Sequence, residues 1–156
     1  MSQVNVAVSR IINAPATEVY PILADYRNHH PHILPKAYFT ELEVEEGGLG
    51  EGTVFRAALQ VMGQKQSFRM RVTEPAPGRV MTEIDLDTEL ETTFTVEPRG
   101  DDQSEVTIAT TFQPRPGLRG WLERLATPGL LRRIYRAELQ QLDEYARQRK
   151  SGQITK

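Results

Sequence analysis

The way in which the spacing of apolar residues changes along the chain is the feature that most constrains its fold. Residues 4–12 alternate apolar and polar side chains, as a half-buried strand does. Residues 15–25 suit a short helix, residues 37–113 read as six further strands, and residues 130–148 have a helical period. Short turns between consecutive strands require antiparallel pairing. We therefore expect an α+β domain in which a curved antiparallel sheet closes around one long helix, with space between them to hold something.

Alternation within each strand predicts which side chains face the helix. Strands at residues 53–61 and 66–72 should be adjacent and antiparallel, because a turn at residues 62–64 joins them. The acidic residues from Glu83 to Glu91 lie mostly at the alternate positions, whose side chains we expect to face solvent. The apolar side chains expected to face inward are Phe55, Ala57, Leu59, Val61, Phe68, Met70, Val72, Val80, Ile84, Leu86, Leu90, Phe94, Val96, Val106, Ile108 and Phe112.

A stripe of residues at helical spacing predicts the C-terminal helix. The stripe would cover one face of a helix about 30 Å long, and its members are Leu131, Tyr135, Leu139, Leu142 and Ala146. A shorter amphipathic piece at residues 118–125 precedes it, and Thr-Pro-Gly at residues 127–129 separates the two. We expect residues 1–149 to form a single domain and residues 150–156 a disordered polar tail.

Composition narrows the class of protein. The chain has no cysteine, which excludes disulfides and thiolate chemistry, and its alternating N-terminus with Arg10 suits neither a signal peptide nor a membrane span. The net charge of −2 combines about −8 over residues 1–113 with about +6 over residues 114–156. The overall pI is near 6, so nucleic-acid binding is not expected. We expect a cytoplasmic monomer or homodimer without integral membrane association.

Several segments together resemble a known superfamily. They are residues 9–20 (SRIINAPATEVY), residues 22–25 (ILAD), the loop at residues 47–53 (GGLGEGT) and the long final helix. In this combination the chain is similar to the START/SRPBCC superfamily, in particular its polyketide cyclase/dehydrase-like members. The resemblance implies the helix-grip fold, a seven-stranded antiparallel sheet wrapped around the C-terminal helix, with two short helices after the first strand. It also implies a cavity for a lipid, a quinone or a polyketide-like aromatic.

The histidines cluster in one segment, at His29, His30 and His32. Imidazole suits transition metals and proton transfer near neutral pH. Three interpretations remain open here, namely a surface or rim loop, a hydrogen-bonding or general-base role at the pocket edge, and a metal site. Because the chain has no His-Glu-x-x-His helix, we expect no metal.

The glycine-rich loop at residues 47–52 precedes a strand instead of a helix, so it lacks the helix N-terminus that cradles a phosphate. Two interpretations fit it. It is either a tight connection that uses the positive φ of glycine, or a mobile lip over the cavity mouth.

Polar residues at positions whose side chains are expected to face the helix are candidates for ligand contacts, because a buried polar group needs a partner. We expect the pocket to combine a few such anchors with apolar side chains. The candidate ligand-binding residues are Phe55, Leu59, Gln66, Met70, Thr82, Ile84, Thr92, Phe94, Ile108, Thr110, Trp121, Leu131 and Tyr135.

The function we expect is binding or transport of a small hydrophobic or amphipathic molecule without a cofactor, since no serine, metal set or nucleotide loop indicates catalysis. The alternative is an enzyme, an aromatase/cyclase or dehydratase acting as a lyase or isomerase, with His29, His30 and Tyr135 as candidate catalytic residues. A third hypothesis is a protein-interaction module that uses the basic helix through Arg132, Arg133 and Arg136.

Overall fold

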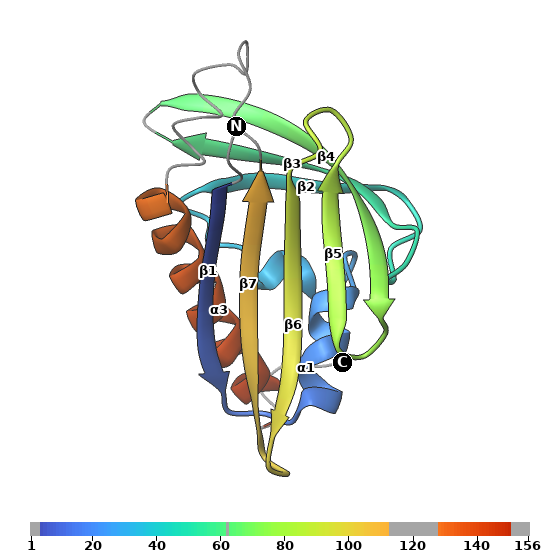
Figure 1. Cartoon of the computed structure of the whole chain (residues 1–156), viewed down its shortest axis with the longest axis vertical. Coiled ribbons are helices and arrows are strands. Elements are labelled where there is room, and N and C mark those ends of the chain that lie inside the picture. Colours follow the sequence, from blue (N-terminus) through green and yellow to red (C-terminus); the bar gives the residue numbers. More distant parts are fainter. Residues whose placement is uncertain (1–3, 62, 113–127, 151–156) are drawn as a thin grey trace.

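The computed structural model describes residues 4–61, 63–112 and 128–150, and shows one sheet with a long helix against it (Figure 1). The elements, in chain order, are β1 (Val4–Ile12), α1 (Ala16–Ala24), the 3-10 helix η1 (His30–Ile33), β2 (Phe39–Glu46), β3 (Val54–Val61), β4 (Gln64–Ala76), β5 (Val80–Asp85), β6 (Glu91–Arg99), β7 (Gln103–Phe112) and α3 (Pro128–Lys150). No helix of this described part has the length and apolar character needed to cross a membrane.

All seven strands pair antiparallel in the order β1-β7-β6-β5-β4-β3-β2. Strands β2 to β7 pair with their neighbours in sequence, while β1 pairs with the last strand, β7. The sheet is strongly curved, and β2 and β3 run across one end of β1, β7 and β6 (Figure 1). The predicted helix-grip fold is thereby confirmed. The second of the two expected short helices is a single 3-10 turn, η1.

The helix α3 packs its apolar stripe into the curve of the sheet. Leu131, Tyr135, Leu139, Leu142 and Ala146 are all buried in one continuous hydrophobic core, as the spacing predicted. The core also takes in α1, whose Val19, Ile22 and Leu23 are buried. Pro128 and Gly129 open α3 instead of interrupting it, and the predicted piece at residues 118–125 lies outside the described residues.

The predicted orientation of β5 is wrong. Met81, Glu83 and Asp85 are buried, whereas Val80 and Ile84 are only partly buried and Leu86 is exposed. The orientation follows from pairing, because Glu83 lies opposite Thr92 of β6, and Thr92 in turn lies opposite Thr110 of β7 on the inner face. A shift of one residue moves every side chain of a strand to the other face, and β5 carries apolar residues on both parities.

Among the described residues, β2 is an edge strand of the sheet. Its Glu41, Glu43, Glu45 and Glu46 are exposed, while Leu42 and Val44 pack against the core. Glu45 accepts a hydrogen bond from Arg69 at 2.7 Å and lies 3.2 Å from Arg56. These arginines lower the pKa of Glu45, so this carboxylate stays charged on the outer face.

Candidate functional site

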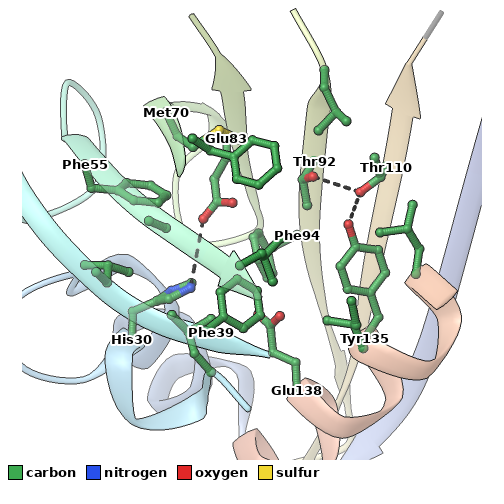
Figure 2. A pocket seen from close by; sticks show the side chains of 18 residues that line it. His30, Phe39, Phe55, Met70, Glu83, Thr92, Phe94, Thr110, Tyr135 and Glu138 are labelled. Atoms are coloured by element: carbon green, nitrogen blue, oxygen red, sulfur yellow. Dashed lines mark hydrogen bonds and ion pairs between the residues drawn. The ribbon is translucent and has the colours of Figure 1, made fainter. Parts of the chain in front are cut away.

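A cavity of about 110 Å³ lies between α3 and the inner face of the sheet (Figure 2). Its walls come from η1, from strands β2 to β7, and from α3. Most of the lining side chains are aliphatic or aromatic. The polar ones are His30, Glu83, Thr92, Thr110, Tyr135 and Glu138. The lining residues are His30, Leu34, Phe39, Leu42, Phe55, Ala57, Leu59, Phe68, Met70, Glu83, Leu90, Thr92, Phe94, Thr110, Leu131, Ile134, Tyr135 and Glu138.

The structure brings eight of the predicted pocket residues to this cavity, namely Phe55, Leu59, Met70, Thr92, Phe94, Thr110, Leu131 and Tyr135. Ile108 is buried in the core and Gln66 is partly buried, but neither lines the cavity. Thr82 and Ile84 belong to the other face of β5, and the Thr82 hydroxyl lies 3.3 Å from that of Thr93. Trp121 is outside the described residues.

Three hydroxyl groups form a chain along one wall of the cavity. The Thr92 and Thr110 Oγ1 atoms are 2.8 Å apart, and Thr110 is also hydrogen-bonded to the Tyr135 hydroxyl. Burial raises the pKa of Tyr135 to about 12, so the phenol is neutral at physiological pH. These groups satisfy one another, and Tyr135 is a weak candidate for proton transfer.

A second polar group, centred on Glu83, lies where two elements meet. Tyr26, just after α1, donates a hydrogen bond to the Glu83 Oε2 atom at 2.5 Å. The His30 Nε2 atom is 3.9 Å from the same oxygen. The Tyr26 ring stacks between His30 and Phe55, with ring centroids 4.4 and 4.7 Å away, and this sandwich fixes all three groups.

Burial sets the protonation of this group. It raises the pKa of Glu83 from 4.5 to about 7, although the Tyr26 hydrogen bond acts in the opposite direction. It also lowers the pKa of His30 to about 4, so the ring is neutral at pH 7. The His30 Nδ1 atom donates to the Leu23 carbonyl at 2.7 Å, which leaves the lone pair on Nε2, the nitrogen that faces Glu83.

A second carboxyl group, that of Glu138, reaches the cavity from α3. Its residue is only 3% exposed, and its Oε2 atom has no hydrogen-bond partner among the described residues. Burial and, after it, the nearby Glu83 raise the pKa of Glu138 well above its ordinary value. An unpaired buried carboxyl group is costly, so a polar group of a ligand is the natural partner for it.

Sequence reasoning missed the two carboxyl groups. Glu83 was assigned to solvent because the orientation of β5 was wrong. Glu138 had a detectable signal, since it lies three residues after Tyr135 and four before Leu142, which places it on the buried stripe of the helix. Tyr26 had no such signal, because it lies in a connection without a period.

The three histidines do not act together. The surface interpretation is wrong for His30, which is 2% exposed. The His29 Nδ1 atom is 2.7 Å from the Tyr145 hydroxyl, and His32 stacks on the Tyr145 ring, so both lie against α3 and not at the cavity. Within the described ranges, no group of three or more His, Cys, Asp or Glu side chains is placed to hold a metal ion.

The glycine-rich loop is tied to the end of α1. Gly47, Gly48, Gly50 and Gly52 all have positive φ, as a tight connection requires. The Tyr26 amide donates to the Gly48 carbonyl at 2.8 Å, and the Gly50 amide donates to Ala24 at 2.9 Å. No residue of the loop lines the cavity, so these contacts favour the tight connection over a lip.

Comparisons with known proteins agree with this architecture. The family model for polyketide cyclase/dehydrase and lipid transport matches residues 3–147. The KanY protein, solved by NMR, is 30% identical with a TM-score of 0.80, and the alignment covers 94% of this chain and 99% of that one. Comparison with curated proteins gives no match.

Two further solved structures share the fold at lower identity. The Zhui aromatase/cyclase from a Streptomyces species is 20% identical with a TM-score of 0.78, covering 95% of this chain and 96% of that one. A START superfamily protein from Mycobacterium smegmatis is 16% identical with a TM-score of 0.67, covering 92% and 97%. At these identities the likeness concerns the fold alone.

Proposed function

The chain belongs to the polyketide cyclase/dehydrase and lipid transport family, and we propose that it binds a small, mostly apolar molecule with a polar group in the cavity between α3 and the sheet. The observation that carries this proposal is the buried Glu138 carboxyl group, whose Oε2 atom has no hydrogen-bond partner within the described part of the chain and which lines a mostly apolar space. Such a combination of an apolar wall and a few polar anchors is typical of small-molecule sites.

The volume of the cavity limits the ligand. An engineered apolar cavity of about 150 Å³ holds one benzene molecule. The present cavity, at about 110 Å³, therefore suits one ring or a short chain, and a larger lipid or polyketide would extend beyond this volume.

A melting panel with plugged variants tests this proposal. A compound present at about 100 times its dissociation constant should stabilise the native state by roughly 2.7 kcal/mol. For a domain of this size we expect the melting midpoint to rise by about 5–10 °C. The panel contains fatty acids, quinones, sterols, aromatic polyketides and single-ring compounds.

Two substitutions should abolish the rise because they fill the cavity. Phe94→Trp and Ala57→Leu enlarge lining side chains that border empty space, so the fold should tolerate them. Ala7→Leu, at an exposed position of β1, is the control and should leave the rise intact. If no compound raises the midpoint and Phe94→Trp destabilises the free protein, the space is a solid core and the proposal is wrong.

A second candidate function is acid–base catalysis on the bound molecule, which the Glu83 carboxyl group favours. Its pKa of about 7 is close to the pH at which a general base works best. In a dehydration, Glu83 would take the proton from the carbon next to a ligand carbonyl and return it to the departing hydroxyl, which leaves as water. Glu83→Gln should then keep binding and lose turnover of a captured ligand, whereas absence of turnover in the wild type supports a carrier.

A further inference from the structure

We propose that the polar group of the ligand is a cation, so that the cavity takes a small apolar amine and holds its ammonium group between the Glu83 and Glu138 carboxyl groups. This inference rests on the proposed function, since it names the chemical class that the same cavity selects. Figure 2 shows Glu83 entering the cavity from the sheet and Glu138 from α3.

The cavity is lined by carboxyl groups but by no cationic side chain among the described residues. Of its 18 described lining residues, none is Lys or Arg. The titratable lining groups are Glu83 on β5, Glu138 and Tyr135 on α3, and His30 on η1. His30 cannot supply the positive charge at neutral pH, because burial lowers the pKa of its ring to about 4. The two carboxyl groups thus lack a cationic partner among these residues.

A buried carboxylate without a counter-charge is unfavourable, whereas a paired and hydrogen-bonded one is tolerated. The Glu138 Oε2 atom, which has no partner among the described residues, is available to accept a hydrogen bond from an ammonium group. A ligand carboxylate would meet only like charge or neutral groups here. A neutral alcohol of the same size would gain a hydrogen bond but no charge pairing. Its affinity should therefore lie between that of the amine and that of the carboxylate.

The aromatic walls favour the same class of ligand. Phe39, Phe55 and Phe94 all line the cavity beside the carboxyl groups. The face of an aromatic ring attracts a cation, and the attraction is stronger in a space without water. Aromatic rings combined with carboxyl groups therefore bind an apolar ammonium ion better than either does alone.

Isothermal titration calorimetry at pH 7.5 with three matched single-ring probes tests the inference. Benzylamine, benzyl alcohol and benzoate have nearly the same size and differ in charge. We expect the wild type to bind benzylamine roughly tenfold or more tighter than benzyl alcohol, and benzoate most weakly. Because a neutral carboxyl group must ionise to pair with the ammonium group, benzylamine should also release protons, which titrations in two buffers of different ionisation enthalpy measure.

Isosteric variants identify the groups responsible. Glu138→Gln and Glu83→Gln should each reduce the preference for the amine and the proton release. Glu144→Gln, an exposed position on the same helix, should change neither. The ranking of the three probes in the wild type requires no variant, so the test does not depend on whether the variants fold.

Two results would overturn the inference and leave the proposed function in place. One is benzyl alcohol or benzoate binding as tightly as benzylamine. The other is a melting shift with neutral quinones or polyketides while benzylamine does not bind. If none of the three probes binds and no compound of the melting panel raises the melting midpoint, both the inference and the proposed function fail.

Discussion

At the scale of the residue, His30 and Glu83 lie as close as an ion pair, but their protonation states differ from those of an ion pair. Their side chains approach to 3.9 Å, which resembles an ion pair. Burial, however, lowers the pKa of His30 to about 4 and raises the pKa of Glu83 to about 7. Between these values both groups are neutral, so the contact is not an ion pair.

These opposite shifts predict a compensated pH dependence of stability. The native state holds the Glu83 proton more tightly than the unfolded chain does, so this stabilisation is lost as pH rises from 4.5 to about 7. His30 binds its proton more weakly in the native state, so its contribution is lost as pH falls from 6.5 to about 4. The two contributions offset each other between about pH 4.5 and 6.5.

Glu83→Gln should remove the compensation. A pKa raised from 4.5 to about 7 corresponds to about 3 kcal/mol, at roughly 1.4 kcal/mol for each tenfold change in proton affinity. The difference in unfolding free energy between the variant and the wild type should therefore shift by about 3 kcal/mol in favour of the variant as pH rises from 4.5 to 7. Urea titrations at several pH values would show this shift. Parallel pH profiles would contradict the assignment, and Glu144→Gln, which is exposed, should follow the wild type.

At the scale of the element, α3 is joined to the end of β1 through Asp143. This buried carboxylate accepts a hydrogen bond from the Asn13 amide at 2.8 Å and lies 3.6 Å from Arg10 and 3.4 Å from Arg147. Arg10 interrupts the apolar pattern of the first strand, and its contact with Asp143 explains why a charge stands there. The helix is thus fixed at one end, away from the cavity.

Asp143→Ala should weaken this attachment. It leaves the Asn13 amide without its acceptor and removes two charge contacts, so the free energy of unfolding should fall by about 1–3 kcal/mol in urea titrations. Glu144→Ala, one residue further along the helix and exposed, is the matched control and should stay within about 0.5 kcal/mol of the wild type. Equal losses in the two variants would show that Asp143 has no special part in docking α3.

The elements were more predictable than the polar centre. The sequence predicted the number of strands and the buried stripe of α3, because packing against a common core imposes a period on the apolar residues. The orientation of β5 was not predictable, since Val80, Met81 and Ile84 put apolar side chains on both parities and only pairing with β6 decides. The contact of Tyr26 with Glu83 joins two segments that no local pattern relates, so the sequence alone could not reveal it.

At the scale of the whole molecule, the sheet and α3 depend on each other. The inner face of the sheet and the apolar stripe of the helix form one continuous core, and β1 joins the sheet by pairing with β7. Neither part could bury its apolar surface alone. We therefore propose that residues 1–149 form a single cooperative domain.

A single domain should unfold in one transition. Urea curves followed by far-ultraviolet and near-ultraviolet circular dichroism should coincide, because secondary structure and packing are lost together. Hydrogen exchange should give the amides of β1 and the middle of α3 similar protection. Separate midpoints, with the helix signal lost before the sheet, would show that α3 detaches as a unit of its own.

The exposed glutamates of β2 also bear on the behaviour of concentrated solutions. An open sheet edge is a template on which a second molecule can add a strand, the first step towards fibres. If two β2 strands paired, Glu41, Glu43 and Glu45 of one molecule would face the same residues of the other, and like charges directly opposite are destabilising. The acidic edge should therefore disfavour this pairing, most strongly at low ionic strength.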